Sequence, residues 1–304
     1  MSATFDPLPD VPSEVENAAQ SGELVVFVGA GISRLIKCPS WDGFADGVLE
    51  QITPACIDYY ELSQIKTIVD PKKRLSIAKI LAQKKNVKID YASIFPQPPD
   101  GENVYTYLNS FNSAFVTTNY EKYLCPVSRR GELEEEWRFY KREQLLGANL
   151  DRNGNVVHIH GCVDDPDSMV ITTRDYLDHY SNEMVQDFLR YLFEKKTILF
   201  LGYGLEEIEI LEYILRRGGA AGKVGEKRIR RYILQGFFNA ETALYDLLRD
   251  YYHELFATEL IRFPKDKKSY AYQIDLLALW SKKLRFADMA LADEVAAMEE
   301  EIRG

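Results

Sequence analysis

The sequence predicts an α/β fold, in which a parallel sheet carries helices on both faces and is interrupted by a helical insertion. Short continuous runs of β-branched and aromatic residues recur along the chain, which is typical of strands buried on both faces. Amphipathic helical patterns separate several of these runs, which favours parallel strand–helix–strand units. Residues from about 40 to 110 contain no convincing run of this kind, and this predicts the insertion.

The elements follow in order. After a short helix that stops at Gly22, strands are predicted at 24–28, 114–117, 156–159, 169–172, 197–201, 231–234 and 259–263. Helices are predicted at 41–51 and 72–85 in the insertion, and at 182–194, 206–217, 240–254 and about 286–302. This order predicts one Rossmann-like domain over 1–304, with its core in 22–38 and 111–284, the insertion at about 40–110 and a C-terminal helix.

Composition narrows the class of protein. A net charge of -10 over 304 residues gives little counterion release at a phosphate backbone, so it argues against direct nucleic-acid binding. No apolar run approaches the roughly 20 residues of a membrane span, and the N-terminus lacks the pattern of a secretory signal. We therefore expect a cytoplasmic protein. The four cysteines form no C-x-x-C pair, so we expect neither a zinc ribbon nor a disulfide framework.

Two glycine-rich turns follow predicted strands. Gly29, Ala30, Gly31 and Ser33 would let the backbone approach a ligand closely, with a helix N-terminus facing a pyrophosphate. The G-x-G-x-x-G fingerprint is incomplete, because Arg34 stands at its third glycine. Gly202 and Tyr203 form the second turn, after strand 197–201. Each turn predicts either one end of a nucleotide site or an ordinary connection into a helix.

Polar residues end two further strands, where ligands bind in open α/β sheets. Thr118, Asn119 and Glu121 follow strand 114–117. An Asn there can hold a ribose hydroxyl or orient a water, although Asn is also common in turns. His158 and His160 end strand 156–159, and strand alternation would place them on one face. An imidazole can act as a general base near neutral pH; a structural pair and a metal site are the alternatives.

In this order, the motifs G-A-G-I-S, T-T-N-Y-E, H-G and G-Y-G resemble those of the sirtuin-like family. Pro39-Ser40-Trp41 is similar to the segment that lines the nicotinamide pocket in sirtuins. The resemblance spans about 22–217, and more weakly continues to about 284. It implies NAD as the substrate and Asn119 and His160 as the catalytic pair. It also implies NAD contacts from Gly29, Ala30, Gly31, Ser33, Trp41, Thr118, Glu121, Gly202 and Tyr203.

The chain departs from the protein deacylases of that family, because it lacks the paired C-x-x-C zinc module that helps form their acyl-peptide cleft. Its details are more similar to bacterial sirtuin-like proteins of antiphage defence, which hydrolyse NAD to nicotinamide and ADP-ribose. We therefore expect an NAD+ glycohydrolase that needs no metal. The alternatives are a protein deacylase or ADP-ribosyltransferase, a non-catalytic NAD or ADP-ribose sensor, and a nuclease subunit, although no carboxylate cluster indicates a two-metal site.

Two further expectations follow. Asn119 and His160 should face a cleft, so that replacing either with alanine removes NAD cleavage with little change in thermal stability. Activity should be controlled through assembly, because a free NAD hydrolase would harm its host and the predicted catalytic fold uses nearly the whole sequence. We expect a homo-oligomer and, by the resemblance to defence systems, a HerA-like ring ATPase as a candidate partner. Candidate surfaces are the C-terminal helix and the basic stretches 72–88 and 227–231; solvated faces are the alternative for the latter.

Overall fold

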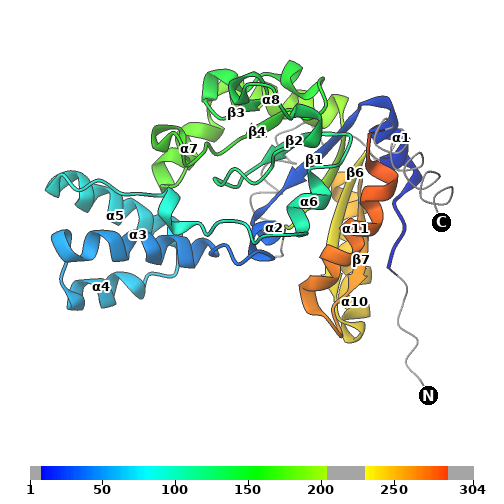
Figure 1. Cartoon of the computed structure of the whole chain (residues 1–304). Helices are drawn as coiled ribbons and strands as arrows, with labels where there is room; N and C mark the ends of the chain where they lie inside the picture. Colours follow the sequence, from blue (N-terminus) through cyan, green and yellow to red (C-terminus); the bar gives the residue numbers. More distant parts are fainter. Residues whose placement is uncertain (1–7, 204–229, 287–304) are drawn as a thin grey trace, which may run out of the picture.

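The sheet has seven strands, and every pairing between them is parallel (Figure 1). The computed structural model describes residues 8–203 and 230–286. Across the sheet the order is β3-β4-β2-β1-β5-β6-β7. The strands are β1 (Leu24–Val28), β2 (Ala114–Thr117), β3 (Arg138–Phe139), β4 (Val156–His158), β5 (Thr197–Leu201), β6 (Arg231–Phe237) and β7 (Thr258–Pro264). The predicted Rossmann-like α/β class is confirmed.

Helices cover both faces of the sheet, because alternate residues of a buried strand point to opposite sides. Leu24, Val26 and Val28 pack into one core with α1 (Ser13–Ser21), α6 (Val104–Leu108) and α11 (Tyr272–Leu284). Val25 and Phe27 pack into a second core with α8 (Glu183–Lys195) and α10 (Thr242–Phe256). Every apolar side chain of β1 is therefore buried, alternately in the core on one face of the sheet and in the core on the other.

The chain between β1 and β2 begins with the short helix α2 (Ala30–Arg34) and then forms α3 (Trp41–Cys56), α4 (Tyr59–Lys66) and α5 (Pro71–Lys85). We call α3–α5 the helical module; it projects to one side of the sheet and has its own apolar core (Figure 1). Arg74 ties α5 to α3, since its buried guanidinium contacts Asp42 and lies 2.8 Å from Asp46. Arg74 is thus unavailable to a partner, unlike the exposed Lys73, Lys84, Lys85 and Lys88 of the same basic stretch.

Several sequence expectations need correction. The strand predicted at 169–172 is wrong: Met169 and Ile171 are buried against the helical module, and Thr172 caps α7 (Thr173–Tyr180). This apolar run is buried in the core of the helical module instead of forming a strand of the sheet. Strand β3 was not predicted, because only two residues form it. The predicted helix 206–217, all of the C-terminal helix 286–302 except its first residue, and Lys227 and Arg228 lie outside the described residues.

Candidate functional site

The two glycine-rich turns meet at the centre of the sheet, where β1 and β5 lie side by side. The chain leaves β1 toward β2 on one side and β5 toward β6 on the other, so this point is the topological switch at which α/β proteins bind ligands. Gly31 N–H donates to Gly202 O over 2.8 Å, and a Cβ on Gly31 would lie 2.5 Å from that oxygen. The glycines are therefore required by the mutual approach of the turns. The Gly31 N–H is used inside the protein, which removes it as a pyrophosphate donor.

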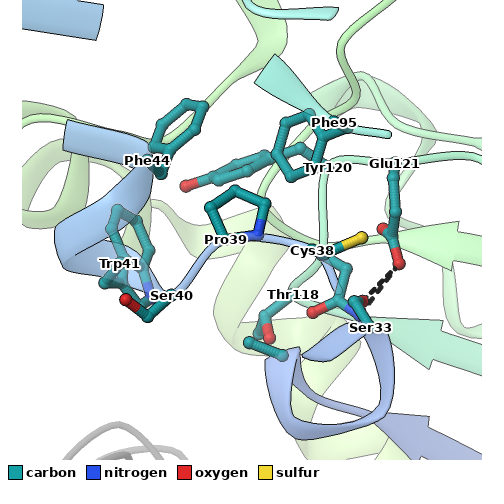
Figure 2. Close-up of a pocket in the computed structure, with 12 residues that line it drawn as sticks. Ser33, Cys38, Pro39, Ser40, Trp41, Phe44, Phe95, Thr118, Tyr120 and Glu121 are labelled. Atoms are coloured by element: carbon teal, nitrogen blue, oxygen red, sulfur yellow. Dashed lines mark hydrogen bonds between the residues drawn. The ribbon is translucent and has the colours of Figure 1, made fainter. Parts of the chain in front are cut away.

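A small cavity of about 40 Å³ lies beside the first turn, and we call it the aromatic pocket (Figure 2). The Trp41 ring stands edge-on to Tyr120 at 5.9 Å between centroids, and Phe44 stacks on Tyr120 at 5.6 Å. Ala30, Ser33, Cys38, Pro39, Ser40, Phe95, Thr118, Asn119 and Glu121 complete the lining. The structure thus brings five of the predicted contact residues and the predicted catalytic Asn to one pocket. Burial raises the pKa of Cys38 to about 12, so this thiol is no nucleophile.

A buried polar cluster forms one wall of the aromatic pocket. Asn119 Nδ2 donates to Ser33 Oγ over 2.8 Å and contacts Gly29 O at 3.2 Å. Ser33 Oγ donates to Glu121 Oε1 over 2.6 Å, and the hydroxyl of Tyr105, from α6, donates to the same oxygen. Burial raises the pKa of Glu121, while its other oxygen, Oε2, is buried and has no partner among the described residues. That buried oxygen can therefore accept a hydrogen bond from an N–H group of a ligand.

His160 does not line the pocket. Its ring is fully buried, with Nε2 2.6 Å from Tyr180 Oη and Nδ1 without a partner in the described part of the chain. The Tyr176 ring packs against both His160 and the pocket residue Trp41, with ring centroids 5.1 Å and 6.2 Å away. Burial, with smaller contributions from His179 and Lys72, lowers the pKa of His160 well below its usual value. The expectation that His160 faces a cleft is therefore wrong for this structure, whereas Asn119 does line a pocket.

The rings of His158 and His160 contact different partners. Strand β4 ends at His158, whose ring contacts Arg138 and the carbonyl of Asn119, whereas His160 packs among residues of α7. The predicted shared face is therefore not formed. Among the described residues no group of three or more His, Cys, Asp or Glu side chains is placed to hold a metal ion. None of the described helices is both long and apolar enough to cross a membrane.

A larger cavity of about 450 Å³ lies on the other side of the first turn, at the carboxyl ends of β5, β6 and β7. Gly31, Gly202 and Tyr203 form its edge, so all the predicted turn residues except Gly29 border one of the two cavities. Ala30 lines the aromatic pocket and its neighbour Gly31 lines the large cavity, which places the two cavities back to back across one turn. The polar residues that line the large cavity include Arg34, Gln235, Glu241, Lys265, Tyr270 and Gln273.

Sequence reasoning missed several residues of this site. Tyr105 and Phe95 come from the segment between the helical module and β2, and nothing in their spacing links them to Glu121. The sequence does contain a pattern for three others, because positions i, i+3 and i+4 of a helix share one face; these are Tyr176, His179 and Tyr180. Such a face marks a buried surface, but it does not reveal that the surface covers His160.

We expect acid to destabilise the fold below about pH 6.5. Burial lowers the pKa of His158 from 6.5 to about 3 and that of His179 to about 4. At a pH between the ordinary pKa of 6.5 and these lowered native pKa values, the unfolded chain binds protons that the native chain excludes. The free energy of unfolding therefore falls as pH falls, by about 1.4 kcal/mol per pH unit for each imidazole. The lowered pKa of His160 acts in the same direction, whereas the raised pKa of Glu121 acts in the opposite direction, because the native chain then binds a proton that the unfolded chain has released. Urea unfolding at pH 7, 6 and 5 measures this slope, and equal stability at all three would contradict it.

The comparisons with known proteins agree with the geometry. Residues 113–254 match the model of the SIR2-like domain. The chain is 27% identical over 229 residues to NAD(+) hydrolase ThsA of Bacillus cereus (strain MSX-D12), covering 70% of this chain and 42% of that protein. It is 25% identical over 210 residues to Defense-associated sirtuin 2 of Bacillus subtilis, covering 65% of this chain and 19% of that protein. The matches thus span less than half of either relative. Together with the parallel sheet and the paired turns, the matches show that residues 113–254 are similar to a SIR2-like domain.

Proposed function

We propose that this chain is an NAD+ hydrolase that releases nicotinamide and ADP-ribose and that it serves antiphage defence by depleting cellular NAD. The names of the two relatives support the substrate and the biological role. The observation that carries the proposal is the arrangement of two cavities on either side of one glycine-rich turn, with Asn119 and Glu121 in the wall of the smaller one. An elongated dinucleotide fits such a path, since it has a ring at each end and a pyrophosphate between them.

In this proposal the nicotinamide enters the aromatic pocket. Trp41 and Tyr120 offer aromatic surfaces to the pyridinium, and Glu121 Oε2 accepts an N–H of the carboxamide. The ribose and pyrophosphate pass over Ala30, and the adenosine occupies the large cavity. A cavity of about 40 Å³ holds little more than one water molecule, so the pocket must widen to admit the ring. The structure is then a closed form of the site.

The chemistry needs little from the protein beyond placement and one proton acceptor. Nicotinamide leaves with the electron pair of the glycosidic bond, which neutralises its ring, and water adds to the oxocarbenium carbon and loses a proton. Asn119 holds the ribose or orients the water. His160 accepts a proton from a ribose hydroxyl or the water once Tyr176 moves aside; such a base contributes roughly a hundred- to ten-thousandfold. Its lowered pKa keeps the ring neutral but makes it a weak base while it is buried, so the same opening that moves Tyr176 aside must also hydrate the ring and bring its pKa back up.

The large cavity gives a binding test of the path. Leu244 lines the cavity from α10, whereas Leu247, one turn further along the same helix, does not. We expect Leu244→Trp to weaken ADP-ribose binding at least tenfold, about 1.4 kcal/mol, because the indole fills the space of the adenosine. Leu247→Trp should bind like the wild type, since Leu247 is 70% exposed. Calorimetric titration with ADP-ribose compares the three proteins, and equal affinity of Leu244→Trp and wild type would place the adenosine elsewhere.

A deacylase would behave differently from a hydrolase. We expect NAD cleavage to be the same with and without an acetyl-lysine peptide, and a chelator to change neither the rate nor the melting temperature. The cysteines are free and lack the paired spacing of a zinc module. Stoichiometric zinc in elemental analysis, or nicotinamide release that requires the peptide, would favour the deacylase.

We further propose that the protein works in the cytoplasm as a homo-oligomer whose activity depends on assembly, with a HerA-like ring ATPase as candidate partner. The closed aromatic pocket supports control of this kind, because the site must open before NAD can enter, and assembly can favour the open form. Light scattering alongside an NAD assay tests it: a stable monomer with full activity in the absence of any partner contradicts the proposal.

A further inference from the structure

Arg138 and His158 form a buried pair that the motifs did not reveal. Arg138 lies on β3, and His158 ends the neighbouring strand β4. Arg138 is 3% exposed and His158 is 0% exposed. Arg138 Nη1 lies 2.7 Å from His158 Nε2. The guanidinium is itself fixed, because it also donates to Leu124 O over 2.6 Å and contacts the carboxylate of Glu134.

This pair determines where the proton of His158 resides. A guanidinium has only donors and stays charged, so Nε2 must be the acceptor of their hydrogen bond. The proton of the neutral ring is then on Nδ1, which donates to Asn119 O over 2.9 Å. Burial, reinforced by the charge of Arg138, holds the pKa of His158 at about 3, so the ring is neutral at physiological pH.

The hydrogen bond from His158 completes the support of one residue. The Asn119 N–H donates to Thr117 Oγ1 over 3.0 Å, and that hydroxyl donates to Val28 O over 2.8 Å. The main chain of Asn119 is thus held at its N–H by β2 and β1 and at its carbonyl by β4. Its side chain is thereby aimed at Ser33 and Gly29 in the wall of the aromatic pocket.

We propose that His158 is a positioning residue for the reacting site: it holds the carbonyl of Asn119, and Arg138 fixes the tautomer that allows it to do so. This inference rests on the proposed NAD cleavage. A histidine that served only packing would not need a defined tautomer, nor would it need to hold the main chain of a residue that lines the aromatic pocket. Reacting groups must be held closely, since a displacement of about 1 Å can cost a hundredfold in rate.

Two variants separate positioning from packing. In His158→Asn the amide nitrogen can occupy the place of Nδ1 and still donate to Asn119 O, but Arg138 loses its acceptor. In His158→Gln the amide oxygen can occupy the place of Nε2 and accept from Arg138, but the carbonyl of Asn119 loses its donor. We expect His158→Asn to have the lower melting temperature and to keep kcat within about threefold. His158→Gln should also lose some stability, because the buried carbonyl of Asn119 is left without its donor, and it should in addition lose roughly 10- to 100-fold in kcat with KM unchanged.

The outcomes are distinct. If kcat follows the melting temperature in both variants, or if His158→Gln keeps the wild-type kcat, the positioning role is overturned. A wild type that never cleaves NAD overturns the proposed function instead, and this role with it. Should neither variant fold, ¹⁵N NMR of histidine-labelled wild type decides: a neutral ring protonated on Nδ1 at pH 6 supports the inference, and a proton on Nε2 or an imidazolium overturns it.

Discussion

Asn119→Ala is expected to reduce NAD cleavage by roughly a hundredfold or more, because it removes the amide that holds the ribose or the water beside the bond that breaks. The side chain lines the aromatic pocket, and its Nδ2 contacts Ser33 and Gly29. Affinity for ADP-ribose should change far less than kcat, since most of the nucleotide lies outside this pocket. Initial rates of nicotinamide release, together with ADP-ribose titration, measure both quantities.

The same substitution should also lower stability, contrary to the expectation from sequence. Asn119 is 8% exposed and its Nδ2 lies within hydrogen-bond distance of Ser33 Oγ, Gly29 O and Glu121 Oε1, so losing these hydrogen bonds costs about 1–3 kcal/mol. Asn112→Ala is the matched control, because Asn112 Nδ2 donates to Ala19 O over 2.7 Å far from the pocket. We expect Asn112→Ala to lose stability and keep its rate. If Asn119→Ala and Asn112→Ala cleave NAD equally well, Asn119 has no role in the reaction.

His160→Gln is expected to slow NAD cleavage by roughly a hundred- to ten-thousandfold, because the amide cannot accept a proton as a general base does. Glutamine is the informative choice, since its terminal amide can still pair with Tyr180 Oη at the place of Nε2. His160→Ala would instead leave a cavity in a fully buried position and lower stability, so the small change expected from sequence does not hold for it.

The control for His160→Gln is the neighbouring buried histidine. The rings of His160 and His179 lie 5.9 Å apart, so His179→Gln makes the same chemical change in almost the same surroundings. We expect His179→Gln to keep wild-type turnover. Near wild-type turnover in His160→Gln would show that the buried imidazole stays behind Tyr176 during the reaction and that another group accepts the proton.

The sheet could be predicted well because its strands obey a simple rule. β1, β2 and β5 are buried on both faces, and each appears in the sequence as an uninterrupted apolar run with the bounds found in the structure. The same rule failed at 169–172, where an equally apolar run is buried against the helical module and is not part of the sheet. Apolar runs report burial, and only pairing partners distant in sequence decide whether a strand forms.

The candidate site could be predicted only where one short segment carries the chemistry. The glycine-rich turns and Asn119 were found because their function depends on local backbone geometry at a strand end. Tyr105 and Arg138 were missed because their importance comes from what folding brings beside them. The burial of His160 could not be foreseen either, since the residues that cover it belong to a helix whose docking depends on the helical module.

Whether the chain cleaves NAD is tested by incubating the purified protein with NAD alone over a range of protein concentrations and separating the products by chromatography. We expect nicotinamide and ADP-ribose in equal amounts, without peptide or added metal, at a rate that changes with assembly or on adding the products of neighbouring genes. Asn119→Ala should leave the NAD intact under the same conditions. If NAD stays intact with the folded wild-type protein under all of these conditions, the chain is not an NAD+ hydrolase.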